Sequence, residues 1–118
     1  MEDKTLLMTM LFDFFGEILT KKQYEYFDLY HNDDLSLSEI AERAGISRQG
    51  VHDIITRAES SLLRMEEKTG VVKRWLDLRT DLEEAKELSR ELVSLMDNNG
   101  TSADIANELF IILESLSI

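Results

Sequence analysis

Proline is absent from all 118 residues, and no other feature of this sequence constrains its fold as strongly. Proline lacks a backbone N–H and its ring clashes with the preceding helical turn, so it is the strongest helix breaker. Glycine is also scarce, at 5 residues. Apolar residues recur instead at spacings of three and four along most of the chain, which is typical of amphipathic helices. The sequence therefore predicts an all-α protein, and its length is that of one folding unit.

The first part of the chain predicts two helices. An apolar stripe indicates one helix over residues 5–19. The sequence "TKKQ" at residues 20–23 has the spacing of a capping box and begins a second helix. That helix ends at "HNDD", residues 31–34, because Asn and Asp compete for backbone hydrogen bonds. The side chains expected to be buried in whole or in part are Leu7, Met10, Leu11, Phe14, Phe15, Ile18, Tyr24, Phe27 and either Leu29 or Tyr30.

Residues 37–56 have the pattern of a helix-turn-helix, in which two helices meet steeply across a tight turn. Ala41 lies where the first helix touches the second, a contact with room for little more than a methyl group. Gly45 stands four residues later, where the turn needs a positive φ, and Ile46 is expected to plug the turn into the core. Further apolar contacts come from Ile40, Ala44, Val51, Ile54 and Ile55, and Ser47 caps the second helix. Two ordinary antiparallel helices are the alternative, but they need neither the small Ala nor the Gly.

The second helix of this motif presents polar side chains that are able to read bases. Arg pairs two ways with guanine in a major groove, and Gln with adenine. Asp53 lies among them, and three arginines are few beside the roughly six to ten phosphate contacts of strong DNA binders. A solvated helix face without a nucleic-acid role is therefore the alternative. The candidate nucleic-acid-binding residues are Ser47, Arg48, Gln49, His52, Thr56, Arg57 and Arg64.

The distribution of charge bears on the same question. The chain has 13 basic and 24 acidic residues, a net charge of -11. Residues 1–35 and 71–118 each carry a net charge of -5, whereas residues 36–70 carry only -1. The middle of the chain is therefore the least repulsive place for a phosphate backbone, although the field of the whole chain repels polyanions.

The remainder of the chain predicts two more helices after a stop at Gly70. One covers residues 72–96 and ends at "DNNG", residues 97–100, and Thr101 or Ser102 caps the next. Their apolar stripes are Trp75, Leu78, Leu82, Ala85, Leu88, Leu92 and Leu95 in the first helix, and Ile105, Leu109, Ile112, Leu113 and Leu116 in the second.

The sequence thus predicts a helix-turn-helix domain over residues 1–70 and a C-terminal helical extension over residues 71–118, within the same folding unit. The first stripe of the extension runs close to a seven-residue repeat, as in a coiled coil. The two stripes offer more apolar surface than a small N-terminal domain needs. We therefore expect a homodimer in which the extension meets its counterpart. The alternative is a monomer whose extension folds back to complete its own core.

The sequence offers no catalytic or cofactor motif. Cysteine is absent, which excludes disulfides, Cys-ligated zinc and a thiol nucleophile. His31 and His52 lack the spacing of metal ligands, and neither a glycine-rich phosphate loop nor a G-x-S-x-G sequence occurs. The start of the chain interrupts its apolar residues with charges and lacks the basic region of a signal peptide. We expect a non-enzymatic cytoplasmic protein without cofactor, metal or membrane segment.

Longer segments carry a resemblance to known families. The segment "LTKKQYEYFDLYHNDDLSLSEIAERAGISRQGVHDIITRAESSL" is similar to region 4 of bacterial sigma factors. With the preceding "LLMTMLFDFFGEIL" and the following "RMEEKTGVVKRWLDLR", it resembles the YlxM family, small helix-turn-helix proteins associated with the bacterial signal recognition particle pathway. The resemblance covers residues 5–80. It implies a helical domain like sigma region 4 and a role as accessory factor or regulator of the particle's GTPase and RNA.

Two functions fit these observations. One is a nucleic-acid-binding regulator that acts through residues 47–57 on DNA or on the RNA of the particle. The other is an acidic adaptor that binds the targeting GTPase of the particle, with the helix-turn-helix as a scaffold. The intact motif favours the first function. The acidic charge favours the second, since Asp53 and Glu59 stand on a helix that is usually basic in sigma region 4.

Overall fold

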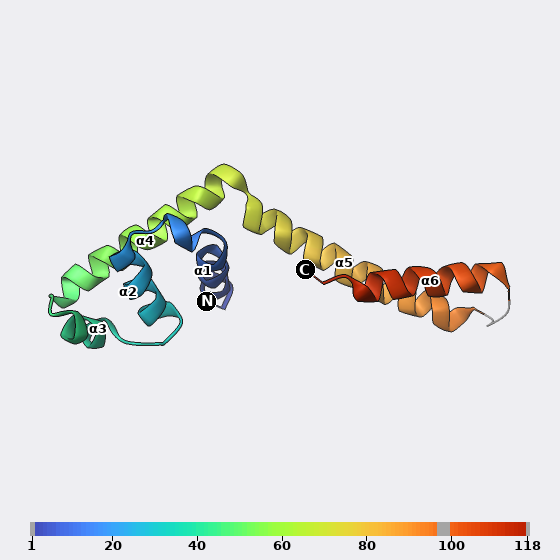
Figure 1. Cartoon of the computed structure of the whole chain (residues 1–118), viewed down its shortest axis with the longest axis horizontal. Helices are drawn as coiled ribbons and strands as arrows, with labels where there is room; N and C mark the ends of the chain where they lie inside the picture. The colour runs from blue at the N-terminus through green and yellow to red at the C-terminus, as the bar shows by residue number, and fades with distance from the viewer. Residues whose placement is uncertain (1, 97–99, 118) are drawn as a thin grey trace. The chain divides into compact units, whose positions relative to one another are not determined.

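The computed structural model describes residues 2–96 and 100–117, most of which are helical (Figure 1). The elements are α1 (Glu2–Phe15), the 3-10 helix η1 (Gly16–Ile18), α2 (Lys21–His31), α3 (Leu37–Ala44), α4 (Arg48–Thr69), α5 (Val71–Leu95) and α6 (Thr101–Ser115). The described residues contain no strand, which confirms the predicted all-α class. None of these helices combines the length and the hydrophobicity needed to cross a membrane.

The chain forms two compact units, Met1–Val72 and Lys73–Ile118. The boundary lies inside α5, so no separate linker joins them. The first unit extends two residues past Gly70 because Val72 is fully buried. The backbone N–H of Val72 also donates to Glu66 Oε1 at 2.9 Å.

The apolar face of α1 differs from the one expected. Its buried residues are Met8, Met10, Leu11 and Phe12. The expectation that Phe14 and Ile18 are buried is wrong, since they are 42% and 46% exposed. The helix ends at Phe15 and the chain turns through η1, so the spacing of one continuous helix no longer applies. Phe12 packs instead on Phe27 of α2, with 4.7 Å between ring centroids.

The start of α2 is the predicted capping box. Thr20 Oγ1 accepts a hydrogen bond from the Gln23 N–H at 3.2 Å, and the Thr20 N–H donates to Gln23 Oε1 at 3.0 Å. Each side chain thus satisfies a backbone donor that has no partner within the helix. The expectation that Tyr24 is partly buried is not met, since it is 44% exposed; Tyr26 and Phe27 are the buried aromatic residues of this helix.

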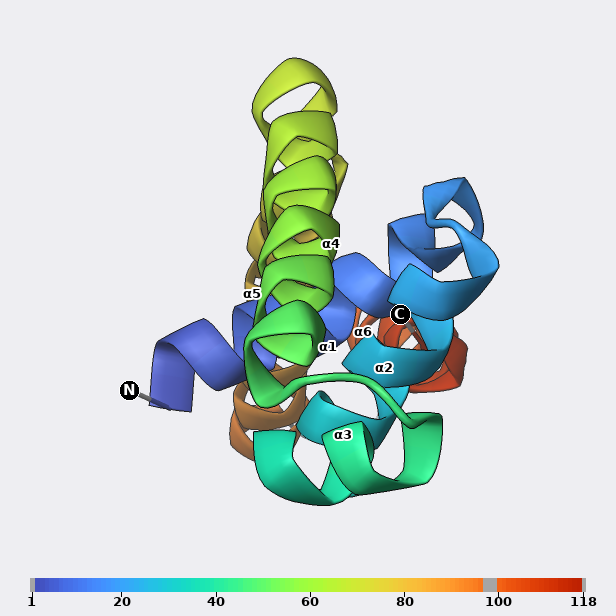
Figure 2. The same cartoon turned by 90° about the vertical axis from the view of Figure 1, so that its left-hand side faces the viewer.

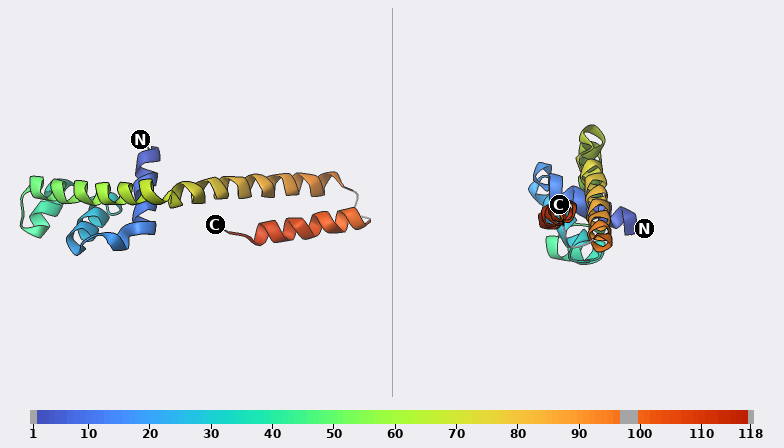
Figure 3. Two further views of the ribbon diagram at one scale, coloured as in Figure 1. Left: turned by 90° about the horizontal axis from the view of Figure 1, so that it is seen from above. Right: turned by 90° about the vertical axis from the view of Figure 1, so that its right-hand side faces the viewer.

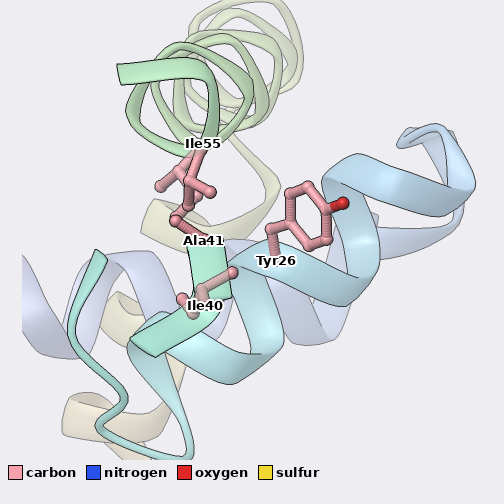
Figure 4. Close-up of a cluster of buried hydrophobic side chains, with 5 residues drawn as sticks. Tyr26, Ile40, Ala41 and Ile55 are labelled. Atoms are coloured by element: carbon pink, nitrogen blue, oxygen red, sulfur yellow. The ribbon is translucent and has the colours of Figure 1, made fainter. Parts of the chain in front are cut away.

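The core of the helix-turn-helix is a cluster of side chains from α2, α3 and α4 (Figure 4). Its buried members are Tyr26, Ile40, Ala41, Val51 and Ile55, which confirms the core positions predicted in α3 and α4. A second capping box holds the start of α3, where Ser36 Oγ accepts from the Glu39 N–H at 3.1 Å. The Ser36 N–H donates in return to the Glu39 carboxylate, and this hydrogen bond lowers the pKa of Glu39.

The turn between α3 and α4 depends on Gly45. Its φ of 70° lies in the left-handed region, which a glycine adopts without strain, as predicted. The N–H groups of Gly45 and Ile46 both donate to the Ala41 carbonyl, at 2.9 and 3.2 Å. Ser47 then caps α4 by accepting from the Gly50 N–H at 3.0 Å. The expectation that Ile46 plugs the turn into the core is wrong: its side chain is 38% exposed and lies over Gly50 at the surface.

Helix α4 is central to the first unit, because α1, α2 and α3 all pack against it (Figure 2). Its buried residues are Val51, Ile55, Ala58 and Leu62. The helix ends at Thr69, and Gly70 follows in the left-handed conformation with a φ of 63°, as predicted. The exposed side of α4 is therefore held in place by three other helices.

The second unit is an antiparallel hairpin of α5 and α6 (Figure 3). Lys86 Nζ donates to the Leu116 carbonyl at 2.8 Å, and Arg90 pairs with Glu114 at 2.6 Å. The N-cap of α6 is Gly100, and Thr101 and Ser102 lie within the helix, so the predicted cap by either residue is wrong. The rest of the predicted break, residues 97–99, lies outside the described residues.

The first prediction concerns the crossing of α3 and α4. Ala41→Leu should overpack this contact, where Ala41 is 8% exposed, and lower the free energy of unfolding by roughly 1–3 kcal/mol. Urea denaturation measures the effect. Ser38→Leu, at an exposed position of the same helix, is the control and should change stability much less. Equal stability of Ala41→Leu and the parent would contradict the close helix crossing.

Candidate nucleic-acid interface

The start of α4 gathers most of the predicted nucleic-acid-binding residues on one side. Ser47 is the N-cap of the helix, and the side chains that follow it are exposed. At 3.6 residues per turn, the four that are candidates for binding, Arg48, Gln49, His52 and Thr56, fall within an arc of about 100° around the helix axis. This reading face consists of Ser47, Arg48, Gln49, His52 and Thr56. The buried residues of α4 point away from it, so the face is open to a ligand.

Asp53 lies at the edge of the reading face and contacts two of its members. Gln49 Nε2 donates to Asp53 Oδ1 at 2.9 Å. His52 Nδ1 lies 3.7 Å from the same oxygen. One of the two amide hydrogens of Gln49 is therefore occupied, while its other hydrogen and its carbonyl oxygen remain available. The anionic residue that opposes phosphate binding thus also orients a residue able to pair with adenine.

Arg57 and Arg64 do not belong to the reading face. They lie roughly a third of a turn further around α4, and they share that side of the helix with Lys68. The spacing of seven and four residues places the three cations in a line, which we call the basic stripe. All three side chains are exposed, and none forms an ion pair with another described residue.

Lys68 belongs to the basic stripe but not to the binding residues predicted from the sequence. The signal that could have found it is its spacing of eleven residues from Arg57, three helical turns along the same face. A shallow depression lies beside the stripe, lined by Ile18, Ser61, Arg64, Met65 and Lys68. The hydroxyl of Ser61 adds a neutral donor next to the cations. This arrangement of donors suits the oxygens of a phosphate backbone.

Glu59 opposes phosphate binding at the reading face and at the basic stripe less than its charge alone predicts. Its carboxylate lies 2.9 Å from His31 Nε2 of α2, and the two side chains are 26% and 13% exposed. The imidazole of His31 also packs on Phe27, with 4.2 Å between ring centroids. The charge of Glu59 is therefore directed toward α2, and this residue contributes to packing in the first unit.

A trihelical core, a left-handed glycine turn and an exposed reading face at the start of the following helix define a helix-turn-helix protein. The profile of the family described as "Putative helix-turn-helix protein, YlxM / p13 like" matches residues 2–107. The chain belongs to this family, named UPF0122, which confirms the resemblance found in its sequence.

Three relatives show how far the similarity extends. A UPF0122 protein of Thermoanaerobacter sp. (strain X514) is 51% identical over 86 residues, 73% of this chain and 74% of the relative. One of Acetivibrio thermocellus is 46% identical over 93 residues, 79% of this chain and 77% of the relative. One of Halalkalibacterium halodurans is 44% identical over 116 residues, 98% of this chain and 96% of the relative. The similarity to the last of these covers both units.

The second prediction tests whether His31 holds Glu59. In a double-mutant cycle with His31→Ala and Glu59→Ala, the coupling energy should be about 1–2 kcal/mol, because the hydrogen bond is largely shielded from water and its acceptor is a carboxylate. Urea denaturation of the four proteins near neutral pH measures it. The exposed pair Gln49 and Asp53 is the matched control and should give about 0.2–0.5 kcal/mol. A coupling near zero for His31 and Glu59 would contradict this role.

Proposed function

We propose that this protein is a non-enzymatic regulator of the cytoplasm that binds nucleic acid through α4. The observation that carries the proposal is the reading face at the start of α4, which the crossing with α3 holds open to solvent. Residues at the start of the second helix are those that contact base edges in the major groove in other helix-turn-helix proteins.

The two surfaces of α4 divide the work of binding. Arg48 and Gln49 supply hydrogen bonds that distinguish bases, since Arg suits guanine and Gln suits adenine. The basic stripe supplies contacts to phosphates, which fix the position of the ligand without reading its sequence. Four exposed cations on one helix are few for a chain of net charge -11, so we expect modest affinity that falls as salt is raised, with a smaller slope than that of strong DNA binders.

The pathway is part of the same proposal. The chain resembles YlxM proteins, which are associated with the signal recognition particle, so the RNA of that particle is a candidate ligand beside DNA. An RNA helix is recognised mainly by its shape and backbone, and its single-stranded loops by base contacts. The basic stripe suits the first kind of contact and the reading face suits the second.

A second candidate function is supported by the charge. Outside residues 36–70 the chain carries a net charge of -10, which attracts a basic protein surface. In this alternative the protein is an adaptor that binds the targeting GTPase of the particle, and the helix-turn-helix is a scaffold. Affinity purification from cell lysate with and without nuclease separates the two functions. Loss of the particle after nuclease treatment supports nucleic-acid binding, whereas retention of the GTPase supports the adaptor.

The third prediction concerns base recognition. Arg48→Ala and Gln49→Ala should each weaken binding to a site selected from random DNA or RNA by about 1–3 kcal/mol, and leave binding to a scrambled sequence nearly unchanged. Fluorescence anisotropy titrations measure both affinities. Arg43→Ala, an exposed arginine of α3 outside the reading face, is the control. A double variant that binds every sequence as the parent does would exclude this reading role.

The fourth prediction concerns the basic stripe. Arg57→Gln, Arg64→Gln and Lys68→Gln should weaken binding to all sequences alike, and each should reduce the slope of log affinity against log salt by roughly 0.7–0.9. Titrations at several salt concentrations give the slope. Lys22→Gln, an exposed lysine of α2, should leave the slope unchanged. Equal slopes for the stripe variants and the parent would remove these residues from the interface.

A further inference from the structure

The α5–α6 hairpin buries small side chains between its two helices. The inner face of α6 contains Ala103 and Ala106, which are 4% and 5% exposed, and α5 contributes Ser89 at 4%. The largest fully buried side chains among the described residues are Leu11, Phe27, Ile40, Val51, Leu62 and Val72, and all of these belong to the first unit. Among the described residues of the second unit, no large apolar side chain is fully buried; Leu82, Val93, Phe110 and Leu113 are half-buried.

Large apolar side chains of the hairpin lie outside this inner face. Three leucines of α5 are spaced by four and three residues. Three aliphatic residues of α6 are also spaced by four and three, and Leu116, the C-cap that follows this helix, continues the row after four more. Each of the seven is between 45% and 78% exposed. This exposed apolar face consists of Leu88, Leu92, Leu95, Ile105, Leu109, Ile112 and Leu116.

Helix geometry places both rows on the same side of the hairpin. In α5 the leucines lie roughly 100° around the axis from the side that faces α6, and in α6 the aliphatic row lies roughly 120° from the side that faces α5. The two helices are antiparallel (Figure 3), and with this arrangement the rotations bring the two rows to one side. The ion pair of Arg90 and Glu114 lies toward the opposite side. The seven residues therefore form one continuous apolar surface.

The size of this surface is that of a protein interface. From the exposed fractions of the seven residues, we estimate roughly 700 Å² per chain, close to the ~800 Å² that each partner buries in a standard complex. A patch of this size exceeds most apolar patches on monomeric proteins, which are about 300–600 Å² at the largest.

We propose that a second copy of this chain covers the exposed apolar face, so that two hairpins form a four-helix bundle. A row spaced by four and three residues packs well against another such row, so the face is complementary to itself. It contains no charged residue, whereas a partner chosen by the acidic charge would need an acidic contact surface. The bundle buries the large side chains that one hairpin leaves exposed. This inference does not depend on nucleic-acid binding.

The oligomeric state of the full chain tests the proposal. Sedimentation equilibrium at micromolar concentration should give twice the 13.6 kDa of one chain. Because both copies carry the same net negative charge, the dimer should become tighter as salt is raised, whereas association with a polyanion becomes weaker. A parent protein that stays monomeric at 100-fold higher concentration would overturn the proposal, and the face would then belong to a different partner or to the chain's own first unit.

Neighbouring isoleucines of α6 provide a matched pair of variants. Ile112→Glu places a charge on the exposed apolar face and should raise the dissociation constant at least tenfold. Ile111→Glu is the control, because Ile111 is 65% exposed but points about 100° away, outside the face. Circular dichroism shows whether Ile112→Glu disturbs the hairpin. If it does, the milder variant Leu109→Gln replaces it, and this variant should also weaken the dimer. Equal weakening by Ile111→Glu and Ile112→Glu would overturn the assignment of this face.

Discussion

The close crossing of α3 and α4 at Ala41 is the contact on which the first unit depends. Only a methyl group separates the two helices there, so α3 packs directly against Val51 and Ile55 of α4. The Ala41 carbonyl accepts two hydrogen bonds from the turn, which ties the crossing to the left-handed Gly45. The direction of α4 is thereby fixed relative to α2 and α3, and so is the surface that it exposes.

The charges around α4 are arranged so that an acidic protein can still present a usable cationic surface. Glu59 pairs with His31, and Glu66 accepts the backbone N–H of Val72, so two carboxylates of this helix serve the packing of the first unit. Asp53 is engaged with Gln49. The cations of the basic stripe have no comparable ion pairs among the described residues. Net charge alone is therefore a poor guide to what this helix is able to bind.

Local signals in the sequence were sufficient to predict the helices of the first unit and its turn. The capping box at Thr20, the left-handed glycines Gly45 and Gly70, and the small Ala41 each depend on interactions within a few residues, and all four were predicted correctly. The solvent exposure of individual side chains was less predictable. Helical spacing shows which residues share a face, but it does not show where a helix stops, as the exposed Ile18 demonstrates.

The candidate site was predictable to a similar extent. The exposure of the reading face follows from the motif itself, because its residues occupy a different side of α4 from the buried ones. Two features needed the arrangement of the helices in space. The contact of Glu59 with α2 joins residues 28 positions apart, and no spacing rule relates them. The exposure of Ile46 depends on how its side chain folds over Gly50, which the sequence pattern does not specify.

The small side chains between α5 and α6 also determine how the chain opens. Ala103 and Ala106 let the helices approach closely but bury little apolar area, so in a single chain separating the two helices requires less free energy than unfolding the first unit. We therefore expect backbone amides of α6 to exchange their hydrogens through a local opening in the single chain, and those in the middle of α4 to exchange only when the whole first unit unfolds. Only the first two residues of α5 lie in the first unit, so the change from slow to rapid exchange is expected within the first turn of this helix.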